Sequence, residues 1–224
     1  GVFDISHMSI FDIQGDQTQA FLQHLLSNDV ALLSTTGRAQ HSLLLNEQGG
    51  VIDDALVFRT DTGYRLVSNA ITRERVQNWL EQHTQTFACT VIWRNDLCLF
   101  SIQGPLARER LASILSSTRA NLIQKLQHHE AAVDGDWLIS CTGYTGEDGI
   151  EIMLPAQQAI DFINELVGAG IAPIGIGARD TLRLEAGFNL YGLDVDEQVS
   201  PLTANMDELI CWQPESRDFI GRNA

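Results

Sequence analysis

An α+β fold is the class that this 224-residue sequence predicts, and three observations support it. Segments that alternate with a period of two, as strands do, are mixed with segments of helical periodicity, without a regular βαβ order. Short turns rich in glycine and aspartate join neighbouring strand segments, which favours antiparallel pairing. Apolar residues form 44% of the chain, enough for one large domain or two modest ones.

The first half of the chain predicts a strand, a helix, a three-stranded meander and a second helix. Residues 8–14 alternate like a strand, and Asp16 is a plausible N-cap for a helix over 17–26. Residues 41–70 follow as three strand segments, separated by the turns NEQGG and TDTG. The next helix is expected over residues 71–83.

Strand segments TVIW and LCLFSIQG begin the second half, and Pro105 suits the first position of a helix ARERLASIL. Residues 117–130 are polar and predict no clear element. A hairpin is expected around TGYTGEDG, between EAAVDGDWLISC and IEIMLP. An amphipathic helix over 156–170 and a last helix over 178–187 complete the pattern.

Charge and residue usage exclude several classes of protein. Acids outnumber bases by 29 to 14, and the resulting charge of −15 disfavours nucleic acid and anionic membranes as partners. No segment is long and apolar enough to predict a membrane span. The four cysteines are widely spaced, which predicts reduced thiols in a cytoplasmic protein. The six histidines form no HxH or HExxH pattern and the serines no GxSxG, so neither a metal site nor a serine hydrolase is predicted.

Two adjacent aspartates interrupt the apolar strand GGVIDDALVF. Because side chains alternate along a strand, Asp53 and Asp54 are expected on opposite faces, with Asp54 beside Ile52, Leu56 and Phe58. On either face a carboxylate lies among apolar residues, and its burial costs free energy unless a partner compensates it. The pair is therefore a candidate functional site.

Two glycine-rich segments each allow a functional and a structural interpretation. In CTGYTGEDGIEI, the three glycines and Glu151 fit either an acid-decorated hairpin turn, which the pattern alone favours, or a site for a heterocycle with amino groups. Glu151 is expected to face away from Ile150 and Ile152. In GIGARDTLRLEAG, Arg179 and Arg183 lie one helical turn apart, as in a ligand site or an ordinary salt-bridged helix.

Taken in order, GVFDISHM, NEQGGVIDDALV, QGP, TGYTGEDGIEI, GARDTLRLEAG, NLYG and DFIGR resemble the aminomethyltransferase (T-protein) family of the glycine cleavage system, in a bacterial form. The resemblance runs from Gly1 to about Arg222. It implies antiparallel and mixed sheets with packed helices around a central cavity. It further implies two α+β domains. The first, which binds folate, consists of residues 1–8 plus 94–198, and the second consists of residues 9–93 plus 199–224. The family's N-terminal start and C-terminal β-barrel are expected to lie outside this sequence.

The resemblance also implies a reaction and its residues. The family transfers the one-carbon unit of an aminomethyl group, carried on the lipoyl arm of H-protein, to tetrahydrofolate, giving 5,10-methylenetetrahydrofolate and ammonia. Asp54 matches the catalytic acid, and Asp53 is then a structural or solvent-facing neighbour. Glu151 and Arg179 match residues of the folate pocket, and the remaining candidate folate contacts are Tyr144, His41, where the family commonly has tyrosine, and Asn69.

Two other functions stay open. The first is a related folate-dependent demethylase that acts on another small methyl donor. The second is a folate-binding regulatory protein without turnover, which the presence of Asp54 argues against.

Overall fold

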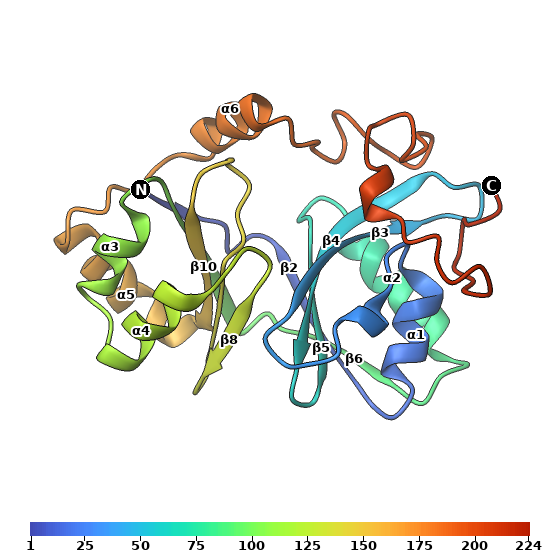
Figure 1. Ribbon diagram of the computed structural model, residues 1–224, viewed down its shortest axis with the longest axis horizontal. Coiled ribbons are helices and arrows are strands. Elements are labelled where there is room, and N and C mark those ends of the chain that lie inside the picture. The colour runs from blue at the N-terminus through green and yellow to red at the C-terminus, as the bar shows by residue number, and fades with distance from the viewer. The chain divides into compact units, whose positions relative to one another are not determined.

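The computed structural model describes all 224 residues and divides into two compact units (Figure 1). Unit 1 consists of Gly1–His7 and Asn95–Phe188, and unit 2 consists of Met8–Arg94 and Asn189–Ala224. Each unit has its own five-stranded sheet in which every paired strand is antiparallel. The predicted α+β class is confirmed. None of the helices has the length and apolar character needed to cross a membrane.

The sheet of unit 1 has the strand order β1-β7-β10-β9-β8. Its strands are β1 (Val2–Asp4), β7 (Leu97–Gln103), β8 (Ala131–Asp134), β9 (Trp137–Ser140) and β10 (Gly149–Pro155). Its helices are α3 (Ala107–Ala112), α4 (Ser117–Lys125), α5 (Ala156–Gly168) and α6 (Ile176–Ala186). One core joins the sheet to α3, α4 and α5, with Ile150 and Ile152 of β10 packed in the same cluster as Leu111, Ile123 and Phe162. The apolar face of β10 is thus committed to the core.

The sheet of unit 2 has the order β3-β4-β5-β2-β6. Its strands are β2 (Ser9–Gln14), β3 (Ala39–Leu45), β4 (Val51–Thr60), β5 (Gly63–Ser68) and β6 (Thr90–Trp93). Its helices are α1 (Thr18–Leu25), α2 (Arg73–Thr84) and the short 3₁₀ segments η1 (Val30–Leu32) and η2 (Asp207–Leu209). Phe21 of α1 and Leu80 of α2 pack against Val57 and Leu66 in one core, so both helices cover the same face of the sheet.

Three local predictions need correction. Helix α1 begins at Thr18 after Gln17, without a side-chain cap, so Asp16 is not its N-cap. Helix α3 begins at Ala107, two residues after Pro105. Residues 117–130, for which the sequence predicts no clear element, contain helix α4. Its N-cap, Ser116, accepts a hydrogen bond from the Arg119 backbone N–H. A single buried residue, Ile123, faces the core from α4, which explains the weak apolar pattern.

Residues 189–198 lie in unit 2, rather than in the first domain as expected. The Val51 backbone N–H donates to the carbonyl oxygens of Asp196 and Val199 at 3.0 and 3.3 Å. Arg75 of α2 forms a two-pronged ion pair with Glu197, at 2.9 and 3.0 Å. Val195 is buried with Val51 in a second apolar cluster of this unit. The segment after α6 is therefore attached to the start of β4.

Strand β4 contains a bulge directly before the two aspartates. Leu45 pairs with Val51 and Leu44 with Asp53, so Ile52 is the extra residue. Ile52 consequently shares the helix-covered core with Ala55 and Val57, and not a face with Asp54 as alternation predicted. The bulge thus changes which apolar residues accompany each carboxylate.

We expect Gly50→Ala to destabilise unit 2, because a Cβ at this position would overlap the Glu197 carbonyl oxygen. Overpacking against backbone costs about 1–3 kcal/mol or more. Gly168→Ala, at the end of α5 with open space around it, is the matched control, and it should be neutral or stabilise by about 0.5–1 kcal/mol. Urea unfolding of both variants measures the difference, and equal stability of the two would contradict this account.

Candidate active site

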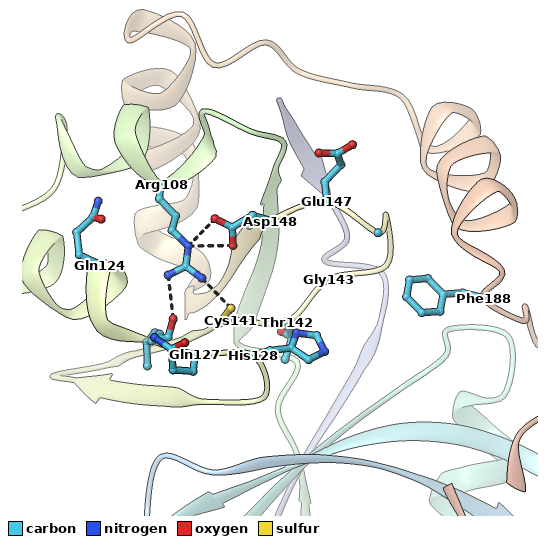
Figure 2. Close-up of a pocket in the computed structure, with 13 residues that line it drawn as sticks. Arg108, Gln124, Gln127, His128, Cys141, Thr142, Gly143, Glu147, Asp148 and Phe188 are labelled. Carbon is cyan, nitrogen blue, oxygen red and sulfur yellow. Dashed lines mark hydrogen bonds and ion pairs between the residues drawn. The ribbon is translucent and has the colours of Figure 1, made fainter. Parts of the chain in front are cut away.

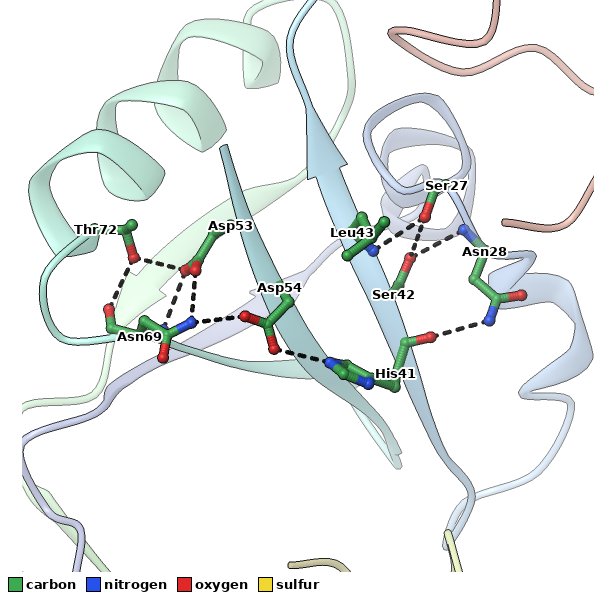
Figure 3. Close-up of polar contacts among 9 residues, drawn as sticks. All are labelled: Ser27, Asn28, His41, Ser42, Leu43, Asp53, Asp54, Asn69 and Thr72. Atoms are coloured by element: carbon green, nitrogen blue, oxygen red, sulfur yellow. Dashed lines mark hydrogen bonds and ion pairs between the residues drawn. The ribbon is translucent and has the colours of Figure 1, made fainter. Parts of the chain in front are cut away.

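Asp53 is fully buried in unit 2 and is bound by three hydrogen-bond donors (Figure 3). Its Oδ1 accepts from the Asn69 side-chain amide at 2.7 Å. Its Oδ2 accepts from the Thr72 hydroxyl at 2.6 Å and from the Asn69 backbone N–H at 3.1 Å. Asp53 is therefore a structural neighbour of Asp54, as one of the two expected alternatives had it, but it does not face solvent.

Asp54 is the more accessible of the two carboxylates, with 21% of its side chain exposed. Its Oδ2 lies 2.9 Å from Nε2 of His41, and its Oδ1 accepts from the Asn69 side-chain amide at 2.9 Å. One amide nitrogen therefore serves both carboxylates (Figure 3). Each oxygen of Asp54 can accept a further hydrogen bond, so the group has capacity left for a ligand.

Strand register explains why these side chains meet. Leu43 of β3 pairs with Asp54, which makes His41 the diagonal neighbour on the same face. Ala55 pairs with Ser68, the last residue of β5, so Asn69 follows directly beside the aspartates. Thr72 comes three residues later at the N-cap of α2. The site is thus built where β5 ends and α2 begins, next to the bulge of β4.

A second group of polar residues holds β3 in place beside His41 (Figure 3). The Asn28 side-chain amide donates to the His41 carbonyl oxygen at 2.9 Å, and the Asn28 backbone N–H donates to the Ser42 hydroxyl at 3.0 Å. The Ser27 hydroxyl accepts from the Leu43 backbone N–H at 3.0 Å. The sequence carries no pattern that would have revealed this support, because it depends on a contact between the end of α1 and β3.

The two aspartates have opposite pKa shifts. Burial, and then the charge of Asp54, raises the pKa of Asp53 to about 7, although the hydrogen bonds from Thr72 and Asn69 favour its ionised form. Burial would raise the pKa of Asp54 as well, but the hydrogen bond and charge of His41, with the hydrogen bond from Asn69, outweigh it and lower that pKa. The accessible carboxylate is therefore the one that carries the negative charge.

Unit 1 holds another buried carboxylate, Glu151 on β10, which is 5% exposed. Its Oε2 accepts from the Thr142 hydroxyl at 2.6 Å, and the Thr142 and Ser140 hydroxyls are 2.8 Å apart. Ile150 and Ile152 lie in the apolar core, so Glu151 faces away from them as predicted. The arrangement is a buried polar cluster of two hydroxyls and one carboxylate.

An aromatic and cationic stack joins the TGYTG turn to α6 in the same unit. The rings of Tyr144 and Phe188 are stacked with centroids 5.6 Å apart, and the guanidinium of Arg179 lies 4.5 Å from the Tyr144 centroid. Arg183 is buried instead and donates to Asp180 at 2.8 Å and to the Phe188 carbonyl oxygen at 3.0 Å. Of the two arginines, Arg179 therefore lies beside Tyr144, which is itself a candidate folate contact, and Arg183 stabilises the end of α6.

The glycines of this turn serve packing within the protein. A Cβ on Gly143 would overlap the side chain of Gln103 on β7, whose Oε1 accepts from the Thr145 hydroxyl at 3.0 Å. Close backbone approach at Gly143 is thus required by β7, which favours the structural interpretation of this glycine.

A cavity of about 660 Å³ lies between the same turn and the segment after α4 (Figure 2). Arg108, Cys141 and Asp148 line it, and sequence reasoning singled out none of the three. Arg108 donates to both carboxylate oxygens of Asp148 at 2.9 and 2.8 Å and to Cys141 Sγ at 2.8 Å. Its guanidinium also donates to the carbonyl oxygens of Ile123 and Leu126, so all three nitrogens of this arginine are hydrogen-bonded within the protein. Across the whole chain, no group of three or more His, Cys, Asp or Glu side chains is placed to hold a metal ion.

These units define an α+β protein with a buried, hydrogen-bonded carboxylate in each antiparallel sheet. The family model described as the GCVT N-terminal domain matches residues 1–213, and the chain belongs to that family. It is 55% identical, over all 224 residues, to a protein of Pseudomonas syringae pv. tomato named aminomethyltransferase. The chain spans 62% of the length of that relative.

Solved structures agree with this assignment. The chain superposes with a TM-score of 0.92 and 35% identity on glycine cleavage system aminomethyltransferase T from Bartonella henselae, covering 100% of this chain and 61% of that one. Heterotetrameric sarcosine oxidase from Corynebacterium sp. U-96 shares the fold alone, with a TM-score of 0.52 and 14% identity over 75% of this chain and 82% of that one.

Asp53→Asn should remove a pH-dependent loss of stability. Between the ordinary pKa of 3.8 and about 7, the folded chain keeps a proton on Asp53 that the unfolded chain has lost. Stability due to this group is therefore largest at low pH and falls as pH rises through that window, by on the order of 1–4 kcal/mol. The lowered pKa of Asp54 acts in the opposite sense, but only below its ordinary value of 3.8.

Urea unfolding at about pH 5 and about pH 7.5 measures this effect as the difference between wild type and variant. Asp61→Asn, an exposed aspartate just beyond the other end of β4, is the matched control and should follow the wild type. Parallel pH dependence of wild type and Asp53→Asn would show that Asp53 is ionised throughout.

Proposed function

We propose that the protein is the aminomethyltransferase of the glycine cleavage system. It takes the aminomethyl group carried on the lipoyl arm of H-protein, releases ammonia, and transfers the one-carbon unit to tetrahydrofolate, forming 5,10-methylenetetrahydrofolate. Family membership supports the proposal, and so do the names of the two relatives that match over the whole of this chain. The observation that carries it is Asp54, an ionised and partly exposed carboxylate held between His41 and Asn69.

Asp54 is assigned as the catalytic residue. Moving a one-carbon unit from an amine to folate nitrogens requires a proton acceptor and a negative charge beside the reacting atoms. A carboxylate does both best when neighbouring donors hold it in one position and solvent reaches it only in part. Asp54 meets these conditions, since both of its oxygens are anchored and its lowered pKa keeps it charged at neutral pH.

Glu151 is assigned to the pterin of tetrahydrofolate. A pterin presents a ring N–H beside an exocyclic amino group, and one carboxylate can accept from both. The carboxylate of Glu151 suits this ligand. Oε2 accepts one hydrogen bond from Thr142, and the two oxygens can accept further hydrogen bonds from a pterin. Tyr144 offers a flat ring and Arg179 a cation beside it.

The remaining contacts follow from the same proposal. His41 and Asn69, which both contact Asp54, are assigned as further folate contacts, and their position beside the carboxylate supports this. Lipoylated H-protein is the protein partner. The reaction is assigned to the cytoplasm, and the four free cysteines are consistent with a reducing compartment.

Asp54→Asn is expected to abolish most turnover while tetrahydrofolate still binds. Loss of a positioned acid–base group costs roughly 10²- to 10⁴-fold in rate. The assay follows tetrahydrofolate-dependent ammonia release from aminomethylated lipoyl H-protein, using the full-length native protein. Asp61→Asn, exposed in the same unit, should keep wild-type turnover.

A wild type that binds folate without releasing ammonia would exclude this function. Turnover with another small methyl donor would then indicate the related demethylase, and binding without any turnover would indicate the regulatory protein. An Asp54→Asn variant with wild-type kcat would move the chemistry to another residue.

Glu151→Gln should weaken tetrahydrofolate binding by about 10- to 100-fold, because an amide accepts from only one of the two pterin donors and loses the charge. Isothermal titration calorimetry measures the change in Kd. Glu165→Gln, an exposed residue of α5, is the control and should bind as the wild type does. Unchanged affinity in Glu151→Gln would remove this residue from the pterin site.

A further inference from the structure

We propose that Asp53 is a positioning residue for Asp54 and that it acts through the side-chain amide of Asn69. The inference rests on the function proposed above, in which Asp54 performs the chemistry. Asp53 itself is 0% exposed, so no substrate atom can reach it. Any effect of Asp53 on the reaction must therefore pass through a neighbour.

Asn69 is that neighbour, because its amide nitrogen has two hydrogens and faces two carboxylates. Nδ2 lies 2.7 Å from Asp53 Oδ1 and 2.9 Å from Asp54 Oδ1. A free asparagine side chain rotates about two torsions, and its terminal torsion is broad. The contact with Asp53 removes this freedom and directs the second N–H at Asp54.

A ring of polar contacts among Asp53, Asn69 and Thr72 fixes the backbone from which Asn69 projects. The Asn69 N–H donates to Asp53 Oδ2 at 3.1 Å, and the Asn69 carbonyl oxygen lies 3.0 Å from the Thr72 hydroxyl. The same hydroxyl lies 2.6 Å from Asp53 Oδ2. Asp53 thus sets both the backbone and the side chain of Asn69, at the point where β5 ends.

The Thr72 hydroxyl can bond Asp53 whether or not Asp53 holds a proton. When Asp53 is ionised, the Thr72 hydroxyl donates to its carboxylate. When Asp53 is protonated, its O–H donates to the Thr72 oxygen, and the Thr72 hydroxyl turns to the Asn69 carbonyl oxygen. Asn69 therefore stays oriented toward Asp54 in both states.

A double-mutant cycle tests the route through Asn69. In the full-length native protein, Asp53→Ala, which removes the acceptor of the Asn69 amide, should lower kcat for ammonia release by about 10-fold with little change in the KM for tetrahydrofolate. In an Asn69→Ala background the same substitution should lower kcat no further, since the connection is already broken. If the two effects multiply, or if Asp53→Ala leaves kcat unchanged, the inference is wrong.

A second readout does not depend on activity. In ¹⁵N-asparagine-labelled protein, the Asn69 side-chain amide should exchange slowly with water in the wild type and in Asp54→Asn. It should exchange rapidly in Asp53→Ala. Should the wild type show no turnover at all, the proposed function falls, and this exchange measurement decides the positioning role alone. Slow exchange in Asp53→Ala would overturn it.

Two further variants separate positioning from general destabilisation. Asp12→Asn removes another buried carboxylate of the same sheet, which is bound by Arg65 and Arg94, and should lower stability without changing kcat. If Asp53→Ala does not fold, Thr72→Val replaces it, because valine keeps the shape and removes the hydroxyl. Thr72→Val should lower kcat and amide protection partially. Wild-type values of both in Thr72→Val would contradict the role of the ring.

Discussion

The site in unit 2 depends on one constraint, which is that two adjacent carboxylates must coexist in a sheet that buries one of them completely. Burial opposes the ionisation of Asp53 and raises its pKa, and the neighbouring charge of Asp54 adds to the effect. Three hydrogen-bond donors contact Asp53 and two contact Asp54, and the side-chain amide nitrogen of Asn69 is one of the donors to each. The negative charge is thereby concentrated on the carboxylate that solvent can reach.

The backbone around the pair is shaped to the same end. The bulge directs Ile52 into the helix-covered core, and Asp53 faces the start of α2. Gly50 then admits the backbone of Glu197, and the chain from 189 to 199 closes over the beginning of β4. The ion pair between Arg75 and Glu197 attaches this segment to the same helix whose N-cap, Thr72, binds Asp53. The contacts that pack residues 189–199 against β4 and α2 therefore also hold the elements that carry the two aspartates.

Sequence patterns predicted most of the strands and helices, and they predicted the orientation of Glu151, because period-two alternation is reliable in a regular strand such as β10. They were wrong where regularity breaks. Alternation could not reveal the extra residue at Ile52, and so it wrongly placed Ile52 on the face of Asp54. The ring through Asn69 and Thr72, and the support from Asn28, join segments that only the register of the sheet brings together. The role of Asp54 itself was expected from a resemblance and stays a proposal.

His41 shows how the pair is adjusted from the other side. The resemblance implies that tyrosine is common where this chain has His41, and a tyrosine hydroxyl could donate to Asp54 as the imidazole does. The hydrogen bond from His41, followed by its charge interaction, lowers the pKa of Asp54 against the effect of burial. Asp53 and His41 therefore both favour the ionised form of Asp54, Asp53 through its own raised pKa and His41 through its contact with the carboxylate. When two carboxylates share a site, an arrangement that pushes their pKa values apart gives each a separate role. Here Asp54 has the charge and the access that chemistry needs, and Asp53 has the burial that holding a neighbour needs.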